Sequence, residues 1–253
     1  MMTIALPDLA TLFMLTFARV GTLVMLLPGT GERPVPGRMR LSFAVLLTLV
    51  LVPVVRGLFP AGDAPAAVIG TMIGEVAVGL ALGLATRIVV AALQIAGTIV
   101  AQELGLSFAM TIDPTQGGGQ EAAIGNFLTL LGVTLVFATD LHHLAIAAIG
   151  NSYELLPPAR MIDTGDAAKL ALGAVGRAFA LGVQISAPFI AFAFLFNLGL
   201  GVLSRLMPQM QVFFLAMPLT ILVGAMVLLA ALGVMMGVYL GQLGGFLRQL
   251  GAG

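Results

Sequence analysis

The densest group of side chains that could do chemistry is Asp140-Leu141-His142-His143, which interrupts an apolar run. Imidazole and carboxylate groups can ligate a metal ion or exchange protons. Zinc hydrolases that bind the metal from one helical face place their histidines one turn apart, as in H-E-x-x-H. Adjacent histidines on a helix point about 100° apart, so we do not expect His142 and His143 to share one ion. The pattern favours a polar boundary where a helix leaves the apolar layer, and it predicts no metal site.

A second candidate for chemistry is Ser107, in the segment Gly105-Leu106-Ser107-Phe108-Ala109. A serine nucleophile elbow requires G-x-S-x-G, and the second glycine is missing here. The sequence also contains neither the P-loop pattern nor the dinucleotide-binding glycine fingerprint. We therefore predict no catalytic residue, no cofactor and no enzymatic activity.

Charged residues lie within or beside the apolar runs at Arg19, Glu75, Arg87 and Glu103. An isolated charge inside a bilayer costs several kcal/mol, so such residues pair, extend to the interface or line a wet cavity. One interpretation is therefore a structural ion pair or interfacial placement. The other is contact with a polar pathway or with a neighbouring subunit, and the sequence leaves both open.

The composition assigns the chain to a membrane. Its 253 residues are 60% hydrophobic and 9% charged, whereas soluble domains carry roughly 25% charged residues. Such a chain cannot cover a water-facing surface, which argues against soluble enzymes as a class. Lysine plus arginine and aspartate plus glutamate number 11 each, so no basic field attracts nucleic acid. There is no cysteine, no tryptophan and only two tyrosines, so the usual interfacial aromatic belts are missing.

Long apolar runs without strand alternation predict an all-α, polytopic membrane protein with broken and hairpin helices. We expect six or seven helices. The run Leu41–Val55 is short for a span, which needs about 20 residues. The run Ala66–Ala101 would form a helix about 54 Å long, so we expect it to bend, fold back or protrude. Two long uncharged stretches on either side of the turn Arg205–Gln211 predict a C-terminal helical hairpin.

The region Gln102–Glu121 is predicted to be a loop. Asp113-Pro114 and Gly117-Gly118-Gly119 cannot continue a helix. The first half of this loop nevertheless carries apolar side chains, up to Ile112.

Several short motifs follow one another in a distinctive order along nearly the whole chain. They are Phe17-Ala18-Arg19-Val20-Gly21, Leu27-Pro28-Gly29, Val35-Pro36-Gly37-Arg38-Met39-Arg40, Gly105-Leu106-Ser107-Phe108-Ala109 with Asp113-Pro114, Asp140-Leu141-His142-His143, Asn197-Leu198-Gly199-Leu200-Gly201 and Pro208-Gln209-Met210-Gln211-Val212-Phe213. Together they resemble the FliR family, the R component of the flagellar type III export gate. The injectisome counterpart, SctT, shares this architecture.

The resemblance implies a non-enzymatic core subunit in the bacterial inner membrane, at the flagellar basal body. It implies assembly with several copies each of FliP and FliQ type membrane proteins into a closed pore for unfolded flagellar proteins. FlhB and FlhA are the further partners to expect, beside lipid and the export substrates, with no nucleic acid. Arg19 and Glu75 would then be compensated by pairing where they face partner subunits.

The resemblance also assigns roles along residues 1–253, which form a single subunit. Residues 1–177 would be the P-like part, with the plug loop at 104–121, and residues 178–247 the Q-like hairpin. The plug residues would be Leu106, Phe108, Met110 and Ile112, followed by Gly117, Gly118 and Gly119, a run that departs from the family pattern. The hairpin tip would be Pro208, Gln209, Met210 and Gln211.

Other functions remain open from the residues alone. A secondary transporter would need a midplane site built from two matching broken helices, and no convincing internal repeat is present. An intramembrane hydrolase using His142 or His143 is the weakest alternative.

Overall fold

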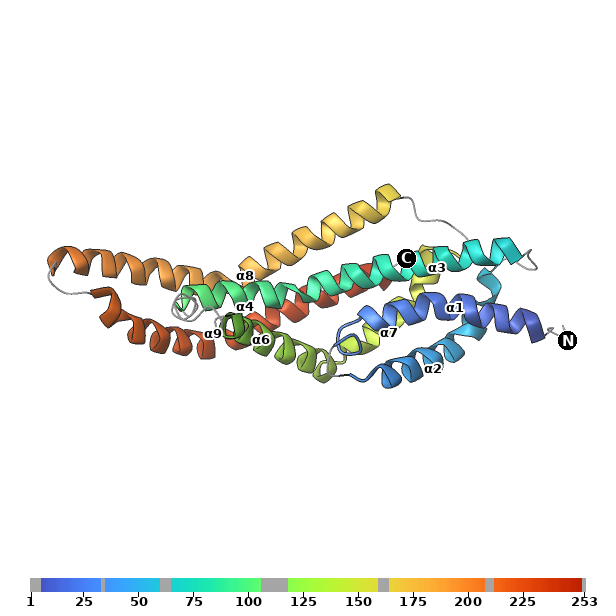
Figure 1. The fold of residues 1–253 in the computed structure, drawn as a ribbon, viewed down its shortest axis with the longest axis horizontal. Coiled ribbons are helices and arrows are strands. Elements are labelled where there is room, and N and C mark those ends of the chain that lie inside the picture. The colour runs from blue at the N-terminus through green and yellow to red at the C-terminus, as the bar shows by residue number, and fades with distance from the viewer. Residues whose placement is uncertain are drawn as a thin grey trace. The chain divides into compact units, whose positions relative to one another are not determined.

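The computed structural model describes residues 6–32, 35–59, 65–105, 118–158, 164–207 and 212–251. All regular elements in these ranges are helical, which confirms the predicted all-α membrane fold (Figure 1). The elements are α1 (Leu6–Leu26), α2 (Gly37–Val55), the 3-10 turn η1 (Arg56–Leu58), α3 (Pro65–Val90), α4 (Ala92–Glu103), α6 (Gly118–Ala138), α7 (Leu141–Leu155), α8 (Thr164–Leu206) and α9 (Val212–Gly251).

The described ranges hold eight α-helices, more than the six or seven expected, because two apolar runs are interrupted. The first interruption is a single residue, Ala91, whose backbone remains in the helical region. The second lies between α6 and α7, where Asp140 has a φ of 58°. Five stretches are long and apolar enough to cross a membrane, or six when α6 and α7 count as one bent span.

Two expectations about span length change with the structure. The run Leu41–Val55, predicted to be short, is longer by about one turn at each end. The resulting segment Gly37–Leu58 has 22 residues and is long enough to span a membrane. The overlong third run is a helical stretch of 37 residues, Ala67–Glu103, interrupted only at Ala91. At 1.5 Å per residue its two helices together measure about 55 Å along their axes, more than a hydrocarbon core of about 30 Å.

The last two helices are longer still. α8 has 43 residues and α9 has 40, and each tolerates an internal proline, Pro188 and Pro218 respectively. Figure 1 shows the two helices leading out and back on either side of their connection, as a hairpin does. The predicted tip residues Pro208–Gln211 lie outside the described residues.

The chain divides into two compact units. The first comprises Met1–Val89, Val136–Gly176 and Leu243–Gly253, and the second comprises Val90–Leu135 and Arg177–Gln242. One border falls beside the predicted division at 177/178, but the C-terminal end returns to the first unit. The P-like and Q-like parts were assigned from the family resemblance, which the division into compact units does not test. The assignment stays a prediction.

Close helix contact in the first unit occurs where α3 presents glycines to α1. A Cβ atom at Gly79 would overlap the hydroxyl of Thr22, and one at Gly83 would come within 2.8 Å of Leu26. Because small residues let helix backbones approach, these two positions set the α1–α3 crossing. α2 contacts both α1 and α7.

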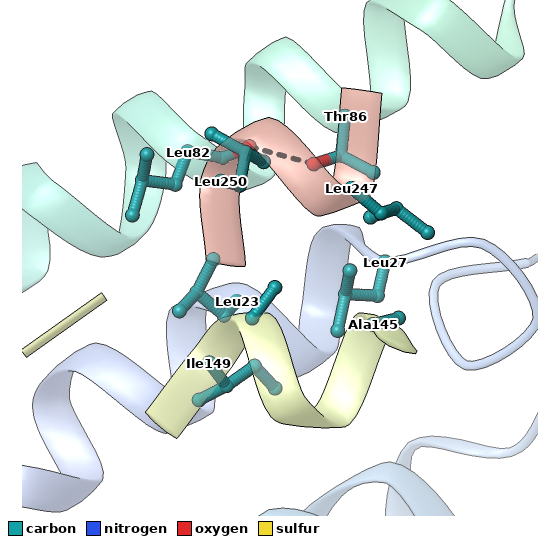
Figure 2. Close-up of a pocket in the computed structure, with 9 residues that line it drawn as sticks. Leu23, Leu27, Leu82, Thr86, Ala145, Ile149, Leu247 and Leu250 are labelled. Carbon is teal, nitrogen blue, oxygen red and sulfur yellow. Dashed lines mark hydrogen bonds between the residues drawn. The ribbon is translucent and has the colours of Figure 1, made fainter. Parts of the chain in front are cut away.

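The end of α9 completes the first unit. Figure 2 shows α1, α3, α7 and α9 around a cavity of about 20 Å³, room for about one water molecule. The labelled lining side chains are Leu23, Leu27, Leu82, Thr86, Ala145, Ile149, Leu247 and Leu250. The hydroxyl of Thr86 donates to the carbonyl of Leu82 at 2.9 Å, so the wall is effectively apolar.

The second unit is built on α4. Leu93, Ala96 and Val100 are fully buried. A Cβ atom at Gly97 would overlap the backbone of Gly125 on α6, so α4 and α6 touch backbone to backbone.

We predict that the C-terminal turn of α9 stabilises the first unit. Leu247 is 1% exposed, so Leu247→Ala should lower the free energy of unfolding in detergent by about 2–5 kcal/mol. Leu229 lies on the same helix and is 76% exposed, so Leu229→Ala is the matched control and should change it by less than about 0.5 kcal/mol. Equal effects of the two substitutions, measured by denaturant titration with circular dichroism, would contradict the packing described here.

Candidate functional site

The centre of the first unit holds a buried ion pair. Arg19, near the middle of α1, is 0% exposed, and Glu75 of α3 is 1% exposed. The Arg19 Nε atom donates to Oε2 of Glu75 at 2.7 Å, and Nη2 donates to Oε1 at 3.0 Å. This bidentate arrangement matches the planar guanidinium to the carboxylate and is the strongest form of such a contact.

The same guanidinium also binds the last turn of α7. Nη1 donates to the carbonyl of Ser152 at 2.9 Å, and Nη2 donates to the carbonyl of Leu156 at 2.8 Å. These carbonyls belong to a helix C-terminus, where a positive charge is favoured. One side chain therefore joins three helices that are far apart in the sequence.

An aromatic ring completes the cluster. The Arg19 Cζ atom lies 4.1 Å from the ring centroid of Tyr153, a cation–π distance. The Tyr153 hydroxyl donates to the carbonyl of Thr16 on α1 at 3.2 Å. Tyr153 and Tyr239 are both fully buried, so neither tyrosine serves as an interfacial anchor.

The cluster decides between the two interpretations of the first two intramembrane charges. Arg19 and Glu75 form a structural ion pair inside the chain and do not face a neighbouring subunit. Four hydrogen bonds occupy the guanidinium, so the pair is compensated internally. Both charges were predicted from the sequence, whereas the contact of Tyr153 with them was not. The only signal was that Tyr153 is one of two tyrosines in the sequence.

Arg87 and Arg40 fasten the connection between α1 and α2. Arg87 is half-buried, and its Nη1 atom donates to the carbonyl of Gly31 at 3.4 Å. Arg40 donates through Nη2 to the next carbonyl, that of Glu32. Gly29 has a φ of 91°, which only glycine adopts readily. Arg87 is thus an internal tether within the first unit.

The remaining predicted residues fall at or beyond the edges of the described ranges. Glu103 is the half-buried last residue of α4, followed by a glycine cap, Gly105, with a φ of 72°. α6 begins at Gly118, so Gly118 and Gly119 start a helix instead of belonging to the predicted loop. Outside the described residues lie Leu106, Ser107, Phe108, Met110, Ile112, Gly117, Pro208, Gln209, Met210 and Gln211.

The structure changes the expectation for the two histidines. The imidazole centroids of His142 and His143 lie 4.1 Å apart, although helical geometry separates adjacent side chains. Asp140 joins them, and one ligand atom from each of the three residues lies within 4.8 Å of the other two. Rotamer freedom in long, partly exposed side chains brings the two rings closer than their separation of about 100° around the helix suggests.

Much of the apolar surface has no covering within the chain. α9 carries the most apolar span, Ala216–Leu250, with a mean hydropathy of 2.6. Only 17% of the most apolar 18-residue part of this span is buried within the chain. Large side chains such as Leu172, Leu206 and Val234 are more than two-thirds exposed. Lipid or other protein chains must cover this surface.

Comparison with known proteins identifies the family. The family model described as "Bacterial export proteins, family 1" matches residues 10–245. The chain is 44% identical over 219 residues to the flagellar biosynthetic protein FliR of Caulobacter vibrioides, covering 86% of this chain and 87% of that protein. It belongs to the FliR family.

Other FliR relatives agree. The chain is 30% identical to the Bacillus subtilis FliR over 236 residues, with 90% and 88% of the two chains covered. It is 29% identical to the Escherichia coli FliR over 209 residues, with 81% and 78% covered. FliR membership and the spanning helices together define a membrane-embedded component of the flagellar protein export apparatus.

We predict strong coupling between Arg19 and Glu75. Arg19→Met and Glu75→Gln should each lower the free energy of unfolding by about 3–5 kcal/mol, because each leaves a buried charge unpaired. The double variant should lose clearly less than the sum, as measured by denaturant titration in detergent.

The exposed pair Asp166–Lys169, at 3.2 Å, is the matched control. The same cycle with Asp166→Asn and Lys169→Met should give a coupling below about 1 kcal/mol. Strictly additive losses at Arg19 and Glu75 would rule out the buried pair as a stabilising unit.

Proposed function

We propose that this FliR chain is a non-enzymatic core subunit of the flagellar type III export gate. It forms, with FliP and FliQ type proteins, the closed pore that conducts unfolded flagellar proteins across the bacterial inner membrane. FlhB and FlhA are its further neighbours at the basal body. Family membership supports a place in the flagellar export apparatus. The distribution of charge and apolar surface supports the role of a gate subunit.

One observation carries the role: the first unit compensates its buried charge internally, while large apolar side chains face outward. Arg19 and Glu75 satisfy each other. By contrast, α8 and α9 expose rows of leucine, valine and phenylalanine side chains. Obligate interfaces are more apolar than the rest of a protein surface. A subunit surrounded by partners needs this arrangement.

The structure gives less support to a solute transporter. The cavity in the first unit holds about 20 Å³ and has an apolar wall, which is too small for a solute. The guanidinium of Arg19 is occupied by Glu75, by two backbone carbonyls and by the ring of Tyr153. Among export systems, the flagellar FliR relatives favour the flagellum over the injectisome.

The resemblance extends this proposal to segments of the chain. Within the plug loop predicted at 104–121, residues 106–117 precede α6 and contain the sealing side chains Phe108, Met110 and Ile112. An apolar plug excludes water through many individually weak contacts, so it can hold back ions and still yield to a chain. Residues 178–247 of the α8–α9 hairpin are the Q-like part, and Pro208–Gln211 are assigned to its tip.

The proposal predicts that partners cover the apolar face of α9. Co-expressed FliP and FliQ type proteins should co-purify with the chain. Because the sequence has no cysteine, Leu229→Cys or Val234→Cys carries a single thiol. Each thiol should react with a detergent-soluble maleimide far more slowly in the complex than in the isolated chain.

Tyr239→Cys is the matched control, since Tyr239 is fully buried on the same helix and should react slowly in both states. Equal labelling of positions 229 and 234 in both preparations would mean that this face contacts lipid. If the FliP and FliQ type proteins do not co-purify with the chain, the proposed function itself is contradicted.

The plug assignment predicts a leak. Removing residues 106–117, which stops before α6 begins, should leave assembly intact and make cells permeable to small ions. The length-preserving variant Phe108→Ser/Met110→Ser/Ile112→Ser should leak in the same way, because polar side chains no longer exclude water.

Thr111→Ala/Gln116→Ala is the control within the same segment and should remain tight. Membrane potential is followed with a voltage-sensitive dye in cells that contain the partner proteins. If the membrane stays impermeable to ions after the deletion, with assembly confirmed, the plug assignment is contradicted but the gate assignment is not.

A further inference from the structure

We propose that Asp140, His142 and His143 form a binding site for a divalent transition-metal ion of the Zn²⁺ type. The site lies in the first unit, at the junction of α6 and α7. The family assignment and the export role do not require it, so this inference goes beyond the proposed function.

The backbone brings the three side chains together. Asp140 adopts the left-handed conformation, with φ 58° and ψ 14°, directly before α7 begins. The His143 amide donates to the carbonyl of Asp140 at 3.0 Å, which places the first turn of α7 against that residue. As a result, Nδ1 of His143 lies 3.7 Å from Oδ1 of Asp140.

His142 supplies a second observation that points to a ligand. Its Nδ1 atom is buried and has no hydrogen-bond partner among the described residues. The ring also packs against Phe137, with centroids 5.3 Å apart. A buried imidazole nitrogen without a partner is costly, and such atoms call for an explanation such as an ion. Coordination of the ion through Nδ1 would satisfy this nitrogen.

The distances suit a metal after small adjustments. One ligand atom from each residue already lies within 4.8 Å of the other two. A tetrahedral ion about 2.0–2.1 Å from each ligand separates the ligand atoms by roughly 3.4 Å. The side chains of His143 and Asp140 are 71% and 77% exposed, so rotamer changes can close the gap without disturbing a packed core.

The ligand types select the class of metal. Two imidazoles and one carboxylate suit Zn²⁺ and its first-row neighbours, whereas Ca²⁺ and Mg²⁺ prefer oxygen ligands alone. Three protein ligands leave a fourth position for water. The metal would link the residue before α7 to its first turn, and so fix the bend that follows α6.

The test uses the tag-free, full-length chain in detergent and Zn²⁺ alone as the probe. His142 and His143 are the only histidines in the sequence, so no other imidazole competes. Competition with a chromophoric chelator should show one Zn²⁺ per chain. Asp140→Asn and His143→Gln should each weaken binding at least ~10-fold. Zn²⁺ should also raise the thermal midpoint of the wild-type chain but not of either variant.

Both variants change exposed side chains, and asparagine retains the left-handed preference of Asp140, so the fold should persist by circular dichroism. His142→Gln is a further variant, with its helicity checked in the same way. Asp166→Asn removes an exposed acid elsewhere in the first unit and should leave Zn²⁺ affinity unchanged. The proposal is overturned if the wild-type chain binds Zn²⁺ no better than the Asp140→Asn/His143→Gln variant, or if Asp166→Asn weakens binding equally.

Discussion

The first unit depends on the need to neutralise one arginine inside an apolar protein. A charge at this depth is tolerated only where every part of it has a partner. Arg19 meets this condition with a carboxylate from α3, two carbonyls from the end of α7 and the face of Tyr153. Because these groups come from separate parts of the chain, α1, α3 and α7 can satisfy the arginine only when they are correctly placed. The ion pair thus specifies the arrangement as well as stabilising it.

Close packing supports the same arrangement. Gly79 and Gly83 follow Glu75 along α3 and let α1 approach closely there. The close contact of the two helices and the ion pair therefore reinforce each other. At the far end of α1, Arg87 holds the connection to α2 through a carbonyl. The charges of Arg19 and Glu75 are thus satisfied inside the first unit. Large apolar side chains lie on its surface, as expected of a FliR subunit within a larger assembly.

Several features of this fold could be predicted from residue patterns, and others could not. The helical class, the hairpin of α8 and α9 and the intramembrane charges follow from apolar runs and their interruptions. The partner of Arg19 could not be predicted, because a single sequence does not say which distant charge lies opposite. Helix ends were also missed: Gly118 starts α6, although a glycine run usually breaks a helix. The proximity of His142 and His143 depends on rotamers, which helical periodicity does not describe.

The return of the last turn of α9 to the first unit affects the order of folding. Leu247 and Leu250 line the same cavity as Leu23 and Leu82, which the ribosome makes more than 150 residues earlier. Synthesis proceeds at roughly 5–20 residues per second, so the N-terminal helices reach the membrane well before this contact can form. The first unit therefore closes only after the end of α9 has been made. A chain truncated before Leu247 would leave an incomplete core for quality-control proteases to recognise.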